Sequence, residues 1–245
     1  GLDAVWILAH QLAEAEADDH VVVEPESVIA THMSQLLVKH APDLIGPDDV
    51  QTLLDSLSRA APTLVSAVVP KLVPLHTVTA VLRALLAERI PIGDLRRILE
   101  GLADLSARNL SAPDMAEALR PMLVPLLLQQ MTPINVALPL VTLDPELEQL
   151  LIRARRPGEE GLMLDTGLAG TIVKSLGDAL EEAIGQGKQP VVIVATQLRR
   201  SFAQFLRPHL PDAIVLGINE LPQSRRVEVV ASIGGQSQLP FRRES

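Results

Sequence analysis

Apolar residues at helical spacing dominate the middle of this chain. From residue 45 to residue 131, valine, leucine and isoleucine recur every three or four positions, which places them on one face of a helix. Short connections that contain proline separate these stretches, so consecutive helices should pack against one another. The pattern predicts an all-helical subdomain over residues 45–131. Its three clearest apolar stripes are Val50–Leu57, Leu75–Leu86 and Leu95–Leu105.

Individual residues mark where these helices should begin and end. Pro47 suits the first position of a helix, where its missing N–H is not needed. Asp94 precedes an apolar stripe and is expected to cap its helix through the side-chain carboxylate. A further helix should start at Asp114. Because proline lacks a donor and clashes with the preceding turn, we expect that helix to bend or stop near Pro121.

After about residue 132 the pattern changes to short strands that alternate with helices. Helices are expected over Asp144–Ile152, over Leu168–Ile184 and through Phe202. Alternating strands and helices predict a small α/β subdomain over residues 132–235, in which helices cover a sheet. The expected strands are 136–141, 191–194, 213–216 and 227–233, and in the last one Val227, Val229, Ala231 and Ile233 should share a half-buried face.

Two polar segments are expected to lack regular structure. Residues 153–161 are charged and contain glycine, which is typical of a mobile loop. Residues 236–245 are polar and lie at the end of the chain, so we expect a disordered tail there.

The first 44 residues are interpreted as part of another α/β subdomain. The β-branched run Val21–Val23 predicts a strand that ends at Pro25, and a helix should follow. A buried strand must pair its backbone groups, and we expect its partners to come from sequence upstream of Gly1. The chain is therefore predicted to be an α+β protein with several subdomains. A mostly helical central subdomain is flanked by this partial α/β segment, residues 1–44, and by the C-terminal α/β subdomain.

The helix after Pro25 should have two different faces. The outer one is uncharged and partly apolar, which is unusual for a solvated helix in an acidic protein. It is either ordinary surface, because scattered exposed valines are common, or a contact surface for another protein. The outer face includes Thr31, Ser34, Gln35 and Val38, and the opposite, inward face carries Ile29, Met33, Leu36 and His40.

Composition excludes several classes of protein and site. The formal net charge of −9 argues against nucleic acid or an anionic membrane as the main partner, because both need a basic surface. The chain has no cysteine, which excludes disulfides and thiolate metal sites and fits a reducing compartment. No apolar run approaches the ~20 residues that cross a bilayer, and Gly1–His10 lacks the features of a signal peptide. We therefore expect a soluble chain.

The strongest enzymatic candidate is Asp165-Thr166-Gly167, the half-site of aspartic proteases, in which two aspartates share a proton. Gly234-Gly235 lies at a plausible distance for a second half. The competing interpretation is that Asp165 or Thr166 caps the helix that begins at Gly167 or Leu168, because a protease needs strands after this triplet. We favour the cap and expect no catalytic residue.

Other possible sites have ordinary interpretations. No two of the 6 histidines have the spacing that places two metal ligands on one helical face, so neither a metal nor a cofactor is expected. Gly185–Lys188 should end a helix and form a turn. Four arginines are expected on solvated surface, the alternative being a docking patch for acidic partners. They are Arg199, Arg200, Arg225 and Arg226.

Several segments in collinear order resemble one family, and the resemblance extends to about residue 235. The family that these segments resemble is the large export-gate subunit of bacterial type III secretion. The chain resembles the flagellar form, the FlhA family, more than the injectisome form. The matching segments are Gly1–Ile7, Val28–His32, Val50–Asp55, Val81–Leu86, Ile92–Glu100 and Val229–Gly235.

The resemblance implies a binding and assembly module, not an enzyme. Members of the family have an amino-terminal bundle of membrane helices and a cytoplasmic part of several subdomains, so this chain should lie at the cytoplasmic face of the bacterial inner membrane. The implied partners are export chaperones with bound flagellar substrates, the export ATPase complex and other copies in a nine-fold ring. The implied chaperone-binding residues are Val28, Thr31, Gln35 and Val38. An injectisome gate protein is the near alternative and an aspartic hydrolase the distant one.

Overall fold

The computed structural model describes residues 5–18, 20–155 and 161–234. The chain divides into two compact units, Gly1–Leu44 and Ile45–Ser245. The expected tail, residues 236–245, and most of the expected mobile loop, residues 156–160, lie outside the described residues. In the part of the chain that is described, no helix is both long enough and apolar enough to span a bilayer.

The first unit contains a 3₁₀ turn, η1 (Ala9–Gln11), and two helices, α1 (Leu12–Ala17) and α2 (Pro25–Leu44). The predicted strand at Val21–Val23 is wrong, because residues 20–24 have no regular structure. Val21 is 91% exposed, and the described residues of this unit supply no strand that could pair with it. Without a partner ladder, a β-branched run gains nothing from an extended conformation.

Helix α2 is exposed on every side. It has no buried residue, so the prediction that one face packs inward is wrong, and Ile29, Met33 and Leu36 are all exposed. The apolar spacing is present, but an amphipathic face becomes buried only where another layer covers it. Among the described residues of the first unit, none provides that layer.

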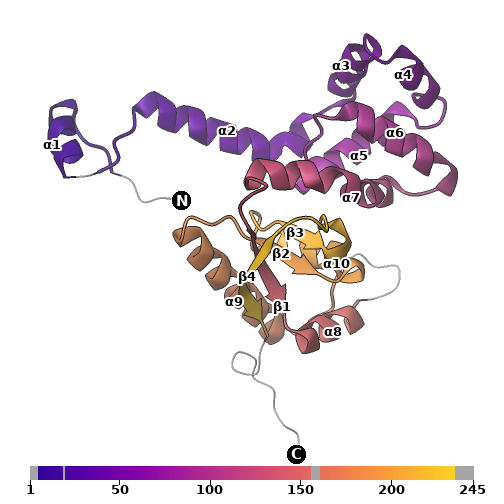
Figure 1. Cartoon of the computed structure of the whole chain (residues 1–245). Helices are drawn as coiled ribbons and strands as arrows, with labels where there is room; N and C mark the ends of the chain where they lie inside the picture. Colours follow the sequence, from indigo (N-terminus) through magenta and orange to yellow (C-terminus); the bar gives the residue numbers. More distant parts are fainter. Residues whose placement is uncertain (1–4, 19, 156–160, 235–245) are drawn as a thin grey trace, which may run out of the picture. The chain divides into compact units, whose positions relative to one another are not determined.

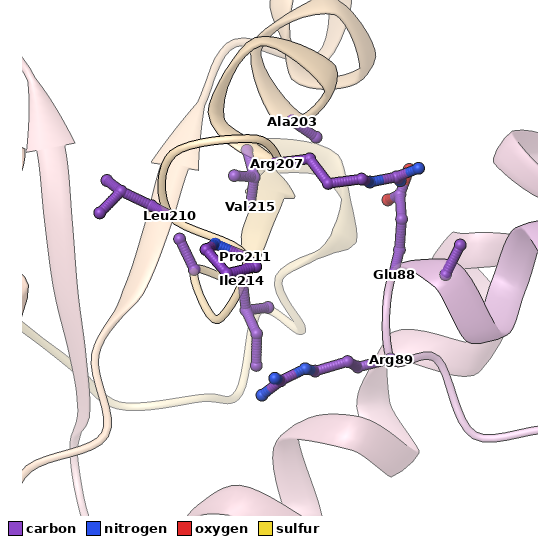
Figure 2. Close-up of a pocket in the computed structure, with 10 residues that line it drawn as sticks. Glu88, Arg89, Ala203, Arg207, Leu210, Pro211, Ile214 and Val215 are labelled. Atoms are coloured by element: carbon purple, nitrogen blue, oxygen red, sulfur yellow. The ribbon is translucent and has the colours of Figure 1, made fainter. Parts of the chain in front are cut away.

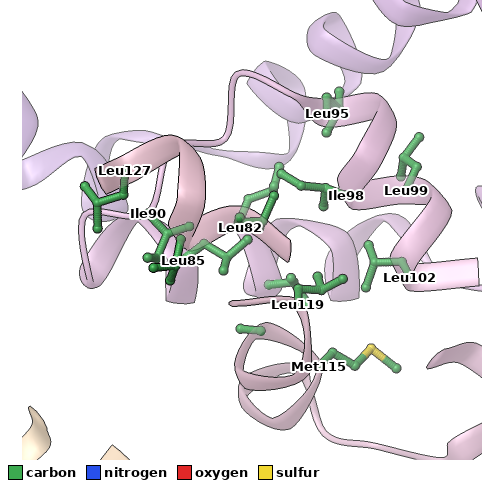
Figure 3. Close-up of a cluster of buried hydrophobic side chains, with 14 of the residues drawn as sticks. Leu82, Leu85, Ile90, Leu95, Ile98, Leu99, Leu102, Met115, Leu119 and Leu127 are labelled. Carbon is green, nitrogen blue, oxygen red and sulfur yellow. The ribbon is translucent and has the colours of Figure 1, made fainter. Parts of the chain in front are cut away.

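The second unit begins with the helical part that the apolar stripes predicted. Five helices surround an aliphatic core, in which Leu82, Ile98 and Leu119 come from different helices (Figure 3). The predicted cap is confirmed, since the Asp94 carboxylate accepts a hydrogen bond from the N–H of Arg97 at 3.1 Å. The helices are α3 (Pro47–Ser58), α4 (Pro62–Val68), α5 (Leu75–Ala87), α6 (Leu95–Leu105) and α7 (Ala112–Met131), with a 3₁₀ turn, η2 (Ser106–Arg108), after α6.

Helix α7 does not stop at Pro121, which was one of the two possibilities predicted from the sequence. It continues past Pro121 and Pro125 to Met131. A proline inside a helix costs about 3 kcal/mol, whereas each large apolar side chain that is buried contributes about 1.5–3 kcal/mol. The core contacts of α7 therefore outweigh its prolines. Its buried apolar residues are Met115, Ala116, Leu119, Leu123, Val124, Leu127 and Leu128.

The remainder of the second unit is the predicted combination of strands and helices. Its four strands are parallel and lie in the order β3-β2-β1-β4 (Figure 1). The strands are β1 (Leu138–Leu143), β2 (Val191–Val194), β3 (Val215–Gly217) and β4 (Val227–Ile233). The helices are α8 (Pro145–Arg153), α9 (Thr166–Gly185) and α10 (Thr196–Leu206), with a 3₁₀ turn, η3 (Ile218–Glu220), after β3.

The two faces of the sheet join two different cores. Leu138, Leu140 and Val191 belong to the same buried cluster as the helices α3–α7. Leu143, Val192 and other residues at alternate positions join the cluster formed by α8, α9 and α10. The sheet is thus the middle layer of the second unit, and the helical part covers one of its faces.

Strand β4 is present as predicted, but its apolar residues do not share one face. The register with β1 shifts between Leu140, opposite Val229, and Val141, opposite Ala231. The extra residue is a bulge, which reverses the alternation of side chains beyond it. As a result Ile233 is buried, whereas Val227 and Val229 are exposed.

Gly101 in α6 provides a test of the close packing between α6 and α7. A Cβ atom at Gly101 would lie 2.4 Å from Cδ2 of Leu119. Gly101→Ala is expected to lower the free energy of unfolding by about 1–3 kcal/mol, because overpacking outweighs the better helix propensity of alanine.

The matched control is Gly170→Ala in α9, where a Cβ would meet nothing within 4 Å. This change should raise stability by about 0.5–1 kcal/mol. Urea unfolding of both variants measures the difference, and an equal effect of the two substitutions would contradict the packing described.

Candidate functional site

Two features of the described chain are candidates for function: the exposed face of α2 and a cluster of charged residues in the second unit. On α2, the residues Val28, Thr31, Gln35 and Val38 are spaced by three or four positions, so the continuous helix holds them in one row. All of them are exposed, Val28 by 43% and Val38 by 53%. The row contains no charged residue, and it is called the α2 row below.

The charged cluster lies where the helical part meets the sheet and α10. Glu88 follows the last residue of α5, and its carboxylate accepts hydrogen bonds from Arg120 on α7 and from Arg199 on α10. Arg207, at the end of α10, approaches the same carboxylate at 3.6 Å. One acidic side chain therefore joins arginines from both parts of the second unit.

Each of the two buried arginines also has a second carboxylate. Arg120 donates from Nε to Oε1 of Glu220 at 2.6 Å and from Nη2 to Oε2 at 3.1 Å. Arg199 donates from Nε to Oε1 of Glu117 at 2.6 Å and makes a further hydrogen bond to Oε2. Bidentate geometry of this kind is the strongest form of arginine–carboxylate contact. Glu88, Glu117 and Glu220 together balance the charges of Arg120, Arg199 and Arg207.

The structure corrects the sequence prediction for the arginines. Arg199 is only 1% exposed and Arg225 only 9%, although both were expected on solvated surface. Arg200 is partly buried and pairs with Asp114 at 2.6 Å. Of the four, Arg226 alone is exposed.

The cluster was missed because its members come from distant segments, and the sequence contained one usable signal. Arg120 lies between Leu119 and Leu123 on a face of α7 that is otherwise apolar. A charged residue in such a position must be paired, because an isolated buried charge is very costly. Its partners, Glu88 and Glu220, lie 32 and 100 residues away and follow only from the fold.

The surroundings shift the pKa values of the acidic members in opposite directions. Burial raises the pKa of Glu88, but the positive charges of Arg120 and Arg199 outweigh it, so the net shift is downward. For Glu117, burial outweighs the nearby Arg199, and the pKa is raised. Burial lowers the pKa of Arg199, but Glu88 and Glu117 reverse this and raise it. Glu88 is thus the acid that the arginines hold in its charged form.

The pockets beside the cluster are small. One, of about 40 Å³, is lined by Glu88, Arg89 and Arg207 and by residues 210, 211 and 213–215, and in Figure 2 the side chains of Glu88 and Arg207 lie close together. The other, of about 180 Å³, lies between α5, α7 and α10. Pockets that hold a small-molecule ligand usually have at least about 300 Å³. The cluster therefore joins two parts of the fold.

Asp165 has the structural role that the sequence favoured. Its Oδ1 accepts hydrogen bonds from the N–H groups of Gly167 at 2.8 Å and Leu168 at 3.3 Å, which caps α9. The helix follows directly where an aspartic protease would need a strand. Gly235, half of the suggested second site, lies outside the described residues.

Two further sequence features are the turn at Gly185–Lys188 and the histidines. The expected turn is confirmed: α9 ends at Gly185, and Gly187 has a φ of 75°, which suits glycine. Within the described ranges, no group of three or more histidine and acidic residues is arranged to hold a metal ion.

Removal of the Glu88 charge tests the importance of the cluster. Glu88→Gln should lower the free energy of unfolding by about 3–5 kcal/mol at neutral pH, because Arg120 and Arg199 stay buried without their shared partner. Glu100→Gln is the control, since Glu100 forms an exposed pair with Arg96 at 3.0 Å and should contribute less than about 1 kcal/mol. Urea unfolding measures both, and a loss for Glu88→Gln as small as for the control would show that the cluster contributes little.

The same variant has a defined dependence on pH. Because the pKa of Glu88 is lowered in the folded state, its contribution is complete above the ordinary value of 4.5 and is lost as the pH falls through the folded value. The stability difference between the natural chain and Glu88→Gln should therefore shrink as the pH is lowered from 7 to 3. A difference that stays constant over this range would contradict the assigned shift.

Comparison of the whole chain with known proteins identifies its relatives. The chain is 36% identical over 236 residues to "Flagellar biosynthesis protein FlhA" of Salmonella typhimurium, an alignment that covers 96% of this chain and 34% of the relative. It is also 28% identical to the protein of the same name from Bacillus subtilis, with 95% of this chain and 35% of that protein covered. The chain thus spans about a third of the length of these curated relatives.

Solved structures also share this fold, and one of them is described as the nonameric EscV cytosolic domain from the type III secretion system, with a TM-score of 0.72 and 22% identity over 91% of this chain and 66% of that one. The Chlamydia pneumoniae CdsV protein matches with a TM-score of 0.83 and 25% identity, over 96% of this chain and 68% of that one. The nonameric SctV-C of EPEC matches with a TM-score of 0.77 and 20% identity, over 92% of this chain and 68% of that one. These likenesses confirm the predicted α+β fold. The FHIPEP family model matches residues 1–226, and the chain therefore belongs to the FHIPEP family.

Proposed function

We propose that this chain is part of the cytoplasmic region of a flagellar type III protein export gate, and that the α2 row docks export chaperones with their bound substrates. The observation that carries the docking proposal is the exposure of α2 on every side, together with a row free of charge. Membership of the FHIPEP family and 36% identity to a flagellar biosynthesis protein support the assignment to an export gate.

The α2 row has the chemistry of a protein-binding surface. The centres of protein interfaces are depleted of charged residues, whereas an ordinary exposed helix in a chain of net charge −9 carries acidic and basic residues all round. Val28 and Val38 supply apolar area, and Thr31 and Gln35 supply hydrogen-bonding groups between them. Such a surface suits a folded protein partner better than a small molecule.

The flagellar assignment is preferred to the injectisome alternative. The sequence is 36% identical to a flagellar relative, compared with 25% for CdsV, although the fold is shared with CdsV and SctV-C. An aspartic hydrolase has no support from the geometry, because Asp165 is used as a helix cap. The proposed activity is therefore binding and transfer, without catalysis.

The other partners follow from the same assignment. One solved relative is nonameric, which supports self-association into a ring of nine copies. A complex of CdsV with CdsO supports a further partner, which for this chain we assign to the export ATPase complex.

The place of action is the cytoplasmic face of the bacterial inner membrane. The division into an N-terminal segment (1–44), a helical subdomain (45–131) and a C-terminal α/β subdomain (132–235) belongs to the same proposal.

A substitution in the middle of the α2 row tests the docking role. Thr31→Met should weaken the binding of a flagellar export chaperone with its substrate by about tenfold, because a longer side chain disturbs the contact and removes a hydroxyl. Isothermal titration calorimetry measures the affinity, with this chain and with a version extended at its amino end to the cytoplasmic length of its relatives. Stability should change by less than about 0.5 kcal/mol, because Thr31 is exposed.

Thr63→Met on α4, another exposed threonine on a helix, is the matched control and should leave the affinity unchanged. If Thr31→Met and the natural chain bind every flagellar chaperone equally well, Thr31 is not part of the docking surface.

A further inference from the structure

An apolar row lies along the outer strand of the sheet. β4 is an edge strand, and the described residues contain no strand that pairs with its other side (Figure 1). Val227 and Val229 on this strand are 48% and 58% exposed. Ile134 and Val136, which precede β1, are exposed as well. Helix α9 contacts β4, and Ile233 near the end of the strand is buried, whereas the first residues of β4, from Val227 to Val229, are exposed.

The backbone of β4 is unpaired at the same two valines. The N–H of Leu138 donates to the carbonyl of Arg226 at 2.9 Å, so Arg226 directs its polar groups toward β1. In a parallel ladder successive residues direct their polar groups to opposite sides. Val227 and Val229 therefore direct their N–H and C=O groups outward. A free edge of this kind is where an extended segment of another protein can pair.

Arg225, directly before β4, gives this edge a chemical preference. Its Nη2 donates to the carbonyl of Thr132 at 2.9 Å, but its Nε is buried and has no hydrogen-bond partner. No carboxylate of the described residues pairs with it. Thr132 caps the end of α7, whose partial negative charge of about half a unit compensates only part of the guanidinium charge. Because the Nε is buried, a carboxylate of a partner reaches the guanidinium only when the Arg225 side chain turns outward, and it would then replace the neutral Thr132 carbonyl with a charged hydrogen bond.

We propose that the edge of β4 binds an extended segment of a partner protein as an added strand, with apolar residues at alternate positions and one carboxylate that reaches Arg225. The bulge after Val229 limits the pairing to the stretch that begins at Arg225. A second copy of β4 is a poorer occupant. Its one carboxylate, Glu228, already pairs with Lys188 at 2.9 Å. This surface is separate from the α2 row, so the proposal does not depend on chaperone docking.

A panel of synthetic peptides tests the proposal. Each fluorescein-labelled peptide has eight residues, with valine at alternate positions, threonine between them and a single glutamate at each threonine position in turn. We expect at least one of these peptides to bind the full chain in fluorescence anisotropy, and its glutamine counterpart to bind about tenfold more weakly.

Variants of the chain locate the binding site. Arg225→Gln should remove the tenfold preference for glutamate, and Val229→Lys, a surface change that does not threaten folding, should abolish binding. Ile218→Lys is the control, because Ile218 is 65% exposed and follows β3, the strand at the opposite edge of the sheet. It should leave the affinity unchanged.

Methylated peptides test whether the backbone takes part. N-methylation of alternate residues blocks one edge of the peptide, so one set of methylated positions should abolish binding and the other should not. The proposal is wrong if no peptide binds more tightly than about 1 mM, if both methylated sets behave alike, or if Arg225→Gln has no effect. It is also wrong if sedimentation shows a dimer of the chain that Val229→Lys disrupts, because a second copy would then occupy the edge.

Discussion

The carboxylate of Glu88 joins the helical part of the second unit to its sheet. It lies just after α5 and receives hydrogen bonds from Arg120 on α7 and from Arg199 on α10. The surrounding contact consists largely of leucines and valines from the helices that cover one face of the sheet, and it also contains the pair between Arg200 and Asp114. Apolar contacts are non-directional and allow two parts to shift against each other. Buried charges need hydrogen bonds of defined length and direction, which restrict the relative position of the parts that carry them. The charged cluster therefore fixes how the two parts fit together.

Each of the two units leaves one apolar surface open. In the second unit, α3–α7 lie on one face of the sheet and α8–α10 on the other, but Val227 and Val229 at the start of β4 remain exposed. In the first unit, α2 has no covering layer at all. Exposed apolar rows are costly in water, so their presence next to well-packed cores points to partners. Both proposed docking surfaces rest on this contrast.

Local sequence patterns predicted most elements of the second unit and failed where distant contacts decide. The stripe at Leu95–Leu105, the cap at Asp94 and the strand at 191–194 depend on neighbours in the sequence, and all are present. The continuation of α7 through Pro121 depends on burial against other helices, and the pairing of Arg199 depends on residues that lie 82 and 111 positions away. Val21–Val23 has the β-branched composition of a strand, but the described residues of the first unit supply no strand with which it could pair. The α2 row could be found from the spacing of its residues, whereas its complete exposure could not.

Hydrogen exchange of the chain with and without a flagellar export chaperone tests the central functional claim most directly. An exposed helix without covering contacts should exchange its amide protons rapidly when free. Bound chaperone is expected to slow exchange across α2, residues 25–44, most strongly around Thr31, and to leave the buried helices α5–α7 unchanged. Slowed exchange elsewhere, with α2 unaffected by a chaperone that demonstrably binds, would contradict the account.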